Sequence, residues 1–152
     1  MKFIIFLITL ISFLNADQYT FLLNKYDKEL ELEAKIISNI ATASIKGEIK
    51  LYIPEISSIE NEVYSKFFIL TNSCEDATFI FIRKNININF LCKSDNNQIF
   101  FTNNYEKLLK DNRYLGAFFW NKSRPNITFI KARLEKQKIE LSKDYDKFVE
   151  DF

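Results

Sequence analysis

Two cysteines are the residues best suited to chemistry in this 152-residue chain, and Cys74 and Cys92 are the only ones it has. A nucleophilic cysteine needs a base that forms its thiolate, and the sequence contains no histidine to serve as one. Two thiolates alone also make a poor metal site, because zinc takes four ligands. We therefore favour a structural Cys74–Cys92 disulfide, which would stabilise the fold by about 3 kcal/mol in the chain-entropy model.

Carboxylates are concentrated near the start of the first predicted helix, at Asp27, Glu29, Glu31 and Glu33. Glu29 and Glu33 share one helix face, so a pair of acids acting in hydrolysis is conceivable. Acids in the first turns of a helix are, however, ordinary complements of its dipole. With only two glycines, the chain also lacks a Gly-rich loop for phosphate. We expect no catalytic residue, no cofactor site and no metal site, and hydrolysis is the weakest alternative.

A basic stretch follows the middle of the chain and is opposed only by Glu135 and Glu140. Its members are Lys122, Arg124, Lys131, Arg133, Lys136, Lys138 and Lys143. Such a stretch either faces an acidic partner or anionic headgroups, or is a solvated face, and we favour the second reading. Trp120 next to a predicted turn is either an interaction hot spot or a core residue. The candidate partner surface comprises Trp120, Lys122, Arg124, Lys131 and Arg133.

The N-terminus has the order of a secretory signal peptide. Lys2 precedes the apolar run Phe3–Leu14, and Asn15 and Ala16 precede polar residues. We predict a signal peptide over residues 1–16 and one domain over residues 17–152, located in the periplasm of a Gram-negative bacterium. The alternative is a retained anchor, although a span needs about twenty apolar residues. Without Lys2 the basic residues equal the 20 acidic ones, and this neutrality argues against nucleic-acid binding.

Strand and helix patterns alternate along the rest of the chain. A helix begins at Asn24 and Gly47 ends it; a short helix covers Glu55–Lys66, another starts at Asn103 and ends at Lys110, and a last one follows Ser142. The predicted strands are Glu48–Ile53, Phe67–Thr71, Ala77–Ile82, Asn85–Leu91, Gln98–Thr102, Tyr114–Trp120 and Asn126–Ile130. This order predicts an α/β fold: a mixed sheet with helices on both faces, in three layers, and a C-terminal β-hairpin followed by a helix.

From Cys74 onwards, about half of the chain resembles the YfiR-like family of periplasmic proteins. The similar segments are Cys74–Phe81, Ile99–Thr102 with the helix Asn103–Lys110, Leu115–Phe119, Ile127–Ile130 and Ile139–Glu150. The resemblance implies a non-enzymatic α/β regulator that binds the periplasmic part of a membrane diguanylate cyclase and holds it inactive, with the disulfide state modulating the effect.

The sequence therefore predicts a small exported binding or regulatory protein with an inner-membrane partner, and a homo-oligomer is a further expectation. The alternative is a periplasmic module that binds a small ligand in the crevice of the sheet, without a signalling partner.

Overall fold

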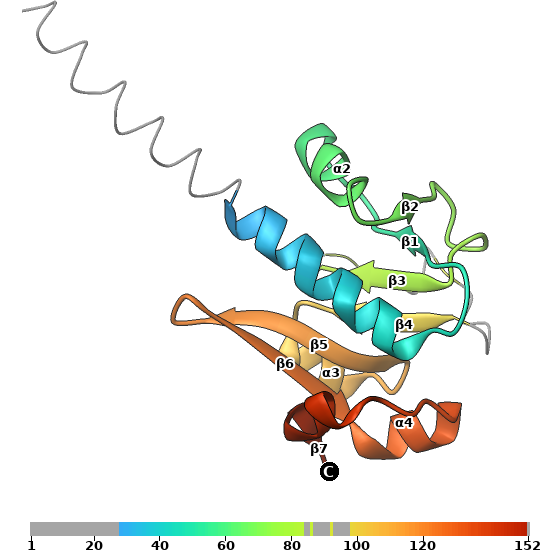
Figure 1. The fold of residues 1–152 in the computed structure, drawn as a ribbon, viewed down its shortest axis with the longest axis vertical. Coiled ribbons are helices and arrows are strands. Elements are labelled where there is room, and N and C mark those ends of the chain that lie inside the picture. Colours follow the sequence, from blue (N-terminus) through green and yellow to red (C-terminus); the bar gives the residue numbers. More distant parts are fainter. Residues whose placement is uncertain (1–27, 84–85, 87–91, 93–97, 152) are drawn as a thin grey trace, which may run out of the picture.

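The computed structural model describes residues 28–83, 86, 92 and 98–151 (Figure 1). These residues form one seven-stranded mixed sheet with helices packed against it, which confirms the predicted α/β class. The predicted signal peptide, and all but Ile86 of the predicted strand 85–91, lie outside the described residues.

The order of the strands across the sheet is β2-β1-β3-β4-β5-β6-β7. Five parallel strands make up most of it: β1 (Lys50–Tyr52), β2 (Ile69–Leu70), β3 (Phe79–Ile82), β4 (Ile99–Thr102) and β5 (Tyr114–Asn121). Strand β6 (Arg124–Ile130) returns antiparallel to β5, and β7 (Val149–Glu150) pairs with β6. The order 2-1-3-4-5 is that of a doubly wound sheet with its switch point between β1 and β3.

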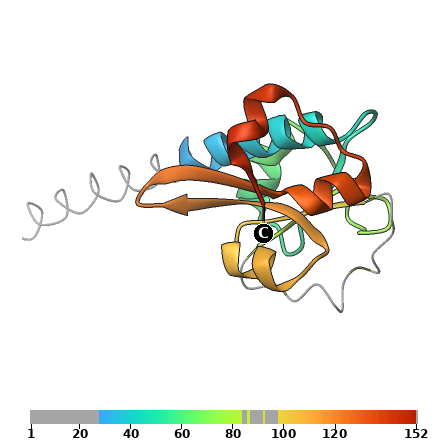
Figure 2. The ribbon, with the colours of Figure 1, turned by 90° about the horizontal axis from the view of Figure 1, so that it is seen from below.

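Helices lie on both faces of this sheet, as the two views in Figures 1 and 2 show. The first helix (residues 28–44), α4 (Lys131–Gln137) and the 3-10 helix η2 (Lys143–Phe148) lie on one side, and α3 (Tyr105–Lys110) lies on the other. The short helix α2 (Ser58–Tyr64) contributes Val63 and Tyr64 to the same core as the first helix.

The central strands are buried on both faces, as expected for parallel strands between helices. All four residues of β3 and all four of β4 are buried. Phe79 and Phe81 pack in the core beneath the first helix, while Ile80 and Ile82 pack in the core on the α3 side. The continuous apolar runs in the sequence therefore give two cores, one on each side of the sheet.

Gly116 in β5 is required by close packing. A Cβ atom at this position would overlap the ring of Phe101 on β4 and the main-chain oxygen of Thr128 on β6. Three neighbouring strands thus approach one another at a point where only a hydrogen atom fits.

The predicted cysteine pair is confirmed at disulfide distance. The sulfur atoms of Cys74 and Cys92 are 2.05 Å apart, and both residues are buried in the α3-side core. Gln98 stabilises the segment from Cys74 to Ala77, because its Nε2 donates to the main-chain oxygens of Cys74 (2.6 Å) and Ala77 (3.1 Å).

The predicted last helix begins after Ser142 as expected, but its type and its end are wrong. The residues after Ser142 form only the 3-10 helix η2, and Val149 lies in β7 opposite Phe129. The ring of Tyr145 packs edge-on against Phe129 at 5.9 Å, so tertiary packing and strand pairing override the helical spacing. The helix α4, in the basic stretch, was not predicted.

Candidate binding surface at the carboxyl edge of the sheet

A half-buried carboxylate lies where the first helix, α2 and β5 meet. Glu33 on the first helix accepts a 2.8 Å hydrogen bond from the hydroxyl of Tyr64 on α2. The Trp120 side chain, near the end of β5, is a second and weaker donor to it. Burial raises the pKa of Glu33 above its ordinary value, and the two donors only partly oppose this. Burial beside Glu33 raises the pKa of the Tyr64 hydroxyl as well, so Tyr64 stays a proton donor.

A second carboxylate, Glu60 on α2, is bound by neighbouring groups of the protein itself. It forms an ion pair with Arg83, and its Oε2 accepts a 2.8 Å hydrogen bond from the main-chain N–H of Ser57. The Ser57 hydroxyl in turn accepts from the N–H of Glu60, which completes a capping box. Burial disfavours the charge on Glu60, but the Ser57 and Arg83 contacts outweigh it and lower its pKa.

Arg83 connects the ends of β1 and β3 at the switch point of the sheet. It directly follows β3, and its Nη2 donates to the main-chain oxygens of Glu55 (3.0 Å) and Pro54 (3.4 Å), which follow β1. The groups that an anionic or polar ligand would use at this crevice therefore already bind one another.

Each element that meets at this edge also carries an exposed apolar side chain. Leu32 precedes Glu33 and is 43% exposed, Ile59 precedes Glu60 and is 54% exposed, and Trp120 is 36% exposed. The Trp120 ring packs edge-on against Phe118 at 5.7 Å. We call Leu32, Ile59 and Trp120 the carboxyl-edge surface. Trp120, the aromatic member of this surface, is therefore partly accessible to solvent and packs against a buried ring.

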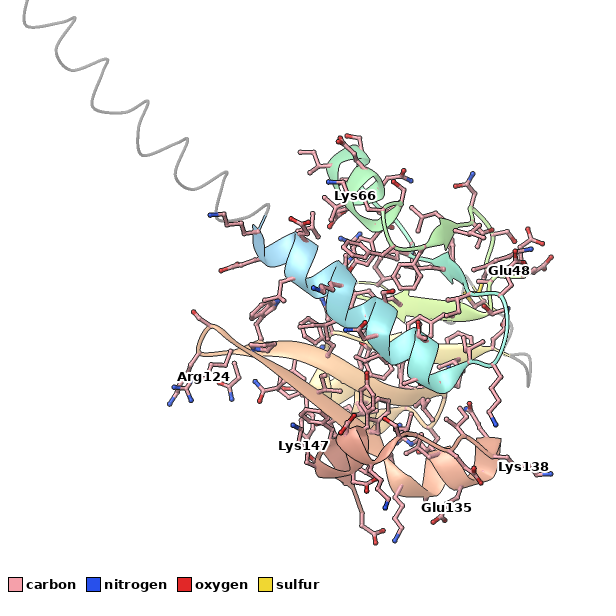
Figure 3. All side chains as sticks on the ribbon, viewed as in Figure 1. Glu48, Lys66, Arg124, Glu135, Lys138 and Lys147 are labelled. Carbon is pink, nitrogen blue, oxygen red and sulfur yellow. A yellow bond between two sulfur atoms is a disulfide. The ribbon has the colours of Figure 1, made fainter. Side chains whose placement is uncertain are left out.

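The five residues of the predicted partner surface fall into two groups at opposite ends of β6. Trp120, Lys122 and Arg124 lie at the turn between β5 and β6, where Lys122 and Ser123 both have positive φ, as in a type I′ hairpin. Lys131 and Arg133 lie on α4, which follows the other end of β6. Figure 3 shows this separation: Arg124 lies at the hairpin tip, whereas Glu135 on α4 and Lys138, which directly follows α4, lie far from it.

The Arg133 guanidinium is held in place by hydrogen bonds to neighbouring elements. Its Nη1 donates to the main-chain oxygens of Leu108 (2.9 Å), Asp111 (3.1 Å) and Tyr114 (2.5 Å), and its Nη2 donates to Asn112 Oδ1 (3.1 Å). Lys131, by contrast, makes an exposed 3.4 Å ion pair with Asp151 near the C-terminus. That these residues bind a partner stays a prediction.

Tyr64, Glu60 and Arg83 were not predicted from the sequence as residues of this site. The spacing of Ser57 and Glu60 is a capping-box signal that could have been recognised. Arg83 comes directly after a buried apolar strand, at the edge where ligand-binding groups of α/β sheets gather. Nothing local marks Tyr64, because its partner Glu33 lies 31 residues away in sequence.

Comparison with known proteins gives no match: no family model fits the chain, and no curated protein and no solved structure is significantly similar to it. None of the helices in the described ranges has the length and apolar character needed to cross a membrane. Within the same ranges, no three cysteine or acidic side chains gather where they could hold a metal ion.

Proposed function

We propose that this protein is a small exported regulator that binds the periplasmic part of an inner-membrane signalling protein through its carboxyl-edge surface. The observation that carries the proposal is Trp120, which is more than a third exposed while its ring packs edge-on against Phe118 and its side chain interacts with Glu33. Tryptophan is enriched among the residues that contribute most to protein interfaces. A ring fixed before binding loses less conformational entropy when the complex forms.

The neighbouring groups fit a protein partner better than a small ligand. Leu32 and Ile59 add apolar surface from two further elements. The polar groups at the switch point are satisfied internally by the Arg83–Glu60 ion pair and the carbonyls that follow β1. The resemblance to YfiR-like regulators favours a membrane diguanylate cyclase as the partner, and repression as the effect.

The proposal is tested by cross-linking in the cell in which the protein is native. A photo-reactive amino acid placed at Leu32 is expected to capture one inner-membrane protein, identified by mass spectrometry. Combining it with Trp120→Ala is expected to reduce this capture at least tenfold, since interface tryptophans often contribute about 2 kcal/mol or more.

The control is Ile69, which is 54% exposed, compared with 43% for Leu32, and lies on the edge strand β2. A probe at Ile69 should not capture the same protein, and Ile69→Ala should leave capture at Leu32 unchanged. Capture that is equally strong from both positions, or that survives Trp120→Ala, would contradict the proposal.

A further inference from the structure

A hollow of about 390 Å³ lies at the other end of β6, away from the carboxyl-edge surface. Its lining residues are Leu109, Asn112, Ile130, Ala132, Arg133 and Lys136. They come from the end of α3, the turn after it, the end of β6 and the outer part of α4. The volume falls at the lower end of the range typical of small-molecule sites, about 300–1,000 Å³.

One part of this lining is apolar and accessible to solvent. Leu109 is 47% exposed, and it is one of the few large apolar side chains that the described residues leave in water. Ala132 beside it is exposed, and Ile130 is buried behind it. Covering Leu109 with an apolar group would remove its surface from water, which is favourable by about 25 cal/mol for each Å².

The other part of the lining is cationic and only partly neutralised by the protein. In the described chain, neither Arg133 nor Lys136 forms an ion pair, and the nearby Asp111 is paired with Arg113. Burial lowers the pKa of Arg133, and the negative charge of Asp111 only partly offsets this. The Arg133 guanidinium remains a partly desolvated positive charge, and such a charge is stabilised by an anion placed next to it.

The Arg133 guanidinium is also held in a fixed orientation. Four hydrogen bonds use Nη1 and one N–H of Nη2, so within the described residues the Nε–H and the second N–H of Nη2 have no acceptor. Oxygen anions are the acceptors that a guanidinium binds best, through two parallel hydrogen bonds. The guanidinium, held by its other hydrogen bonds, therefore retains donors for a carboxylate or a phosphate.

We propose that this hollow binds a small amphiphilic anion, in which a carboxylate or phosphate group meets Arg133 and Lys136 while an attached apolar chain covers Leu109 and Ala132. The site is separate from the carboxyl-edge surface, so it does not depend on the protein partner proposed above. Fatty acids and phospholipid headgroups both present this chemistry in a cell envelope.

The test titrates the isotope-labelled protein with soluble probes and follows its amide signals by NMR. Decanoate represents the fatty acid and decyl phosphate the lipid headgroup, each used below its micelle concentration. Decyl maltoside has the chain without the charge, and acetate has the charge without the chain. We expect one or both anionic amphiphiles to shift the amides of Leu109, Ala132 and Lys136 with saturation, and the two control probes to leave them unchanged.

Two variants locate the site without disturbing Arg133. Ala132→Phe, at an exposed position, is expected to fill the hollow and abolish binding, and Lys136→Glu to weaken it about tenfold. Lys143→Glu reverses an exposed charge outside the hollow and should have no effect. The proposal is overturned if no anionic probe binds, if decyl maltoside binds as well as decanoate, or if Ala132→Phe leaves the affinity unchanged.

Discussion

Near each end of β6 lies a charged side chain that lacks a partner of opposite charge at hydrogen-bonding distance. The two charges are stabilised by different kinds of groups. Near the hairpin, the carboxylate of Glu33 accepts from Tyr64 and, more weakly, from Trp120. At the far end, the Arg133 guanidinium donates to three main-chain oxygens and one side-chain oxygen. One charge is thus held by side chains of separate elements, and the other mainly by the backbone.

This difference decides what each region can do. A carboxylate with a raised pKa can take up a proton, so the packing around Glu33 and Trp120 can respond to acidity. An arginine cannot lose its proton under ordinary conditions, so the Arg133 cluster remains a permanent positive charge. We therefore expect the carboxyl-edge surface to be adjustable and the hollow beside α4 to be rigid.

The largest expected effect is at Arg133. Arg133→Met removes the donor that joins the end of α3, the start of β5 and α4, and leaves three main-chain oxygens without it. We expect a loss of about 3 kcal/mol in the free energy of unfolding, because hydrogen bonds from charged groups contribute about 1.5–3 kcal/mol. Urea denaturation followed by circular dichroism measures this loss.

Lys136→Met is the matched control, since Lys136 is exposed on the same helix and makes no hydrogen bond in the described chain. It should change the free energy of unfolding by less than about 0.5 kcal/mol. Similar losses in the two variants would show that Arg133 contributes only its charge, and the contrast between the two ends of β6 would fail.

Glu33→Ala should have a smaller effect. The variant leaves the Tyr64 hydroxyl without its acceptor, but it also removes a carboxylate whose burial is unfavourable. Since these two consequences oppose each other, we expect a net loss of about 1 kcal/mol at neutral pH. Glu33→Gln keeps an acceptor and should lose less, which the same denaturation experiment checks. If Glu33→Ala lowers the free energy of unfolding as much as Arg133→Met does, the Glu33 carboxylate does not contribute less to stability than the Arg133 guanidinium.

The sequence predicted the fold better than it predicted the contacts around Glu33 or around Arg133. Buried parallel strands such as Phe79–Ile82 and Ile99–Thr102 are continuous apolar runs, and this signal is local. The ending was mispredicted because Tyr145 and Val149 follow contacts with Phe129, which no helical spacing reveals. Arg133 could be noticed only as one basic residue among several, since its role depends on carbonyls 19 to 25 residues away.

The pH dependence of stability should separate Glu33 from the other carboxylates. A raised pKa means that folded Glu33 holds its proton more tightly than the unfolded chain does, so its favourable contribution is complete below the unfolded value of 4.5. That contribution is lost as the pH rises through the higher folded pKa. Glu60 and Asp111 have lowered pKa values and act in the opposite sense, losing their contribution as the pH falls.

Subtracting the stability of Glu33→Gln from that of the unsubstituted protein isolates this one titration. The difference should decrease as the pH is raised from about 4.5 towards neutrality, measured by urea denaturation at each pH. A difference that is constant, or that increases with pH, would mean that the carboxylate is not destabilised by its burial.

Trp120→Phe is expected to reduce stability less than Glu33→Ala does, and this variant tests the link between Glu33 and the carboxyl-edge surface most directly. Phenylalanine keeps a ring beside Phe118 but lacks the indole N–H, so the unfolding free energy should fall by less than about 1 kcal/mol. Because the Trp120 contact lowers the pKa of Glu33, its removal should raise that pKa further, and carbon-detected NMR titration of the carboxyl group measures it. Tyr105→Phe is the matched control: it removes a donor to Glu150 instead, and it should leave the Glu33 titration unchanged.

If Trp120→Phe also leaves the pKa of Glu33 unchanged, protonation of Glu33 and the position of Trp120 are independent. Acidity would then not affect the carboxyl-edge surface through this contact.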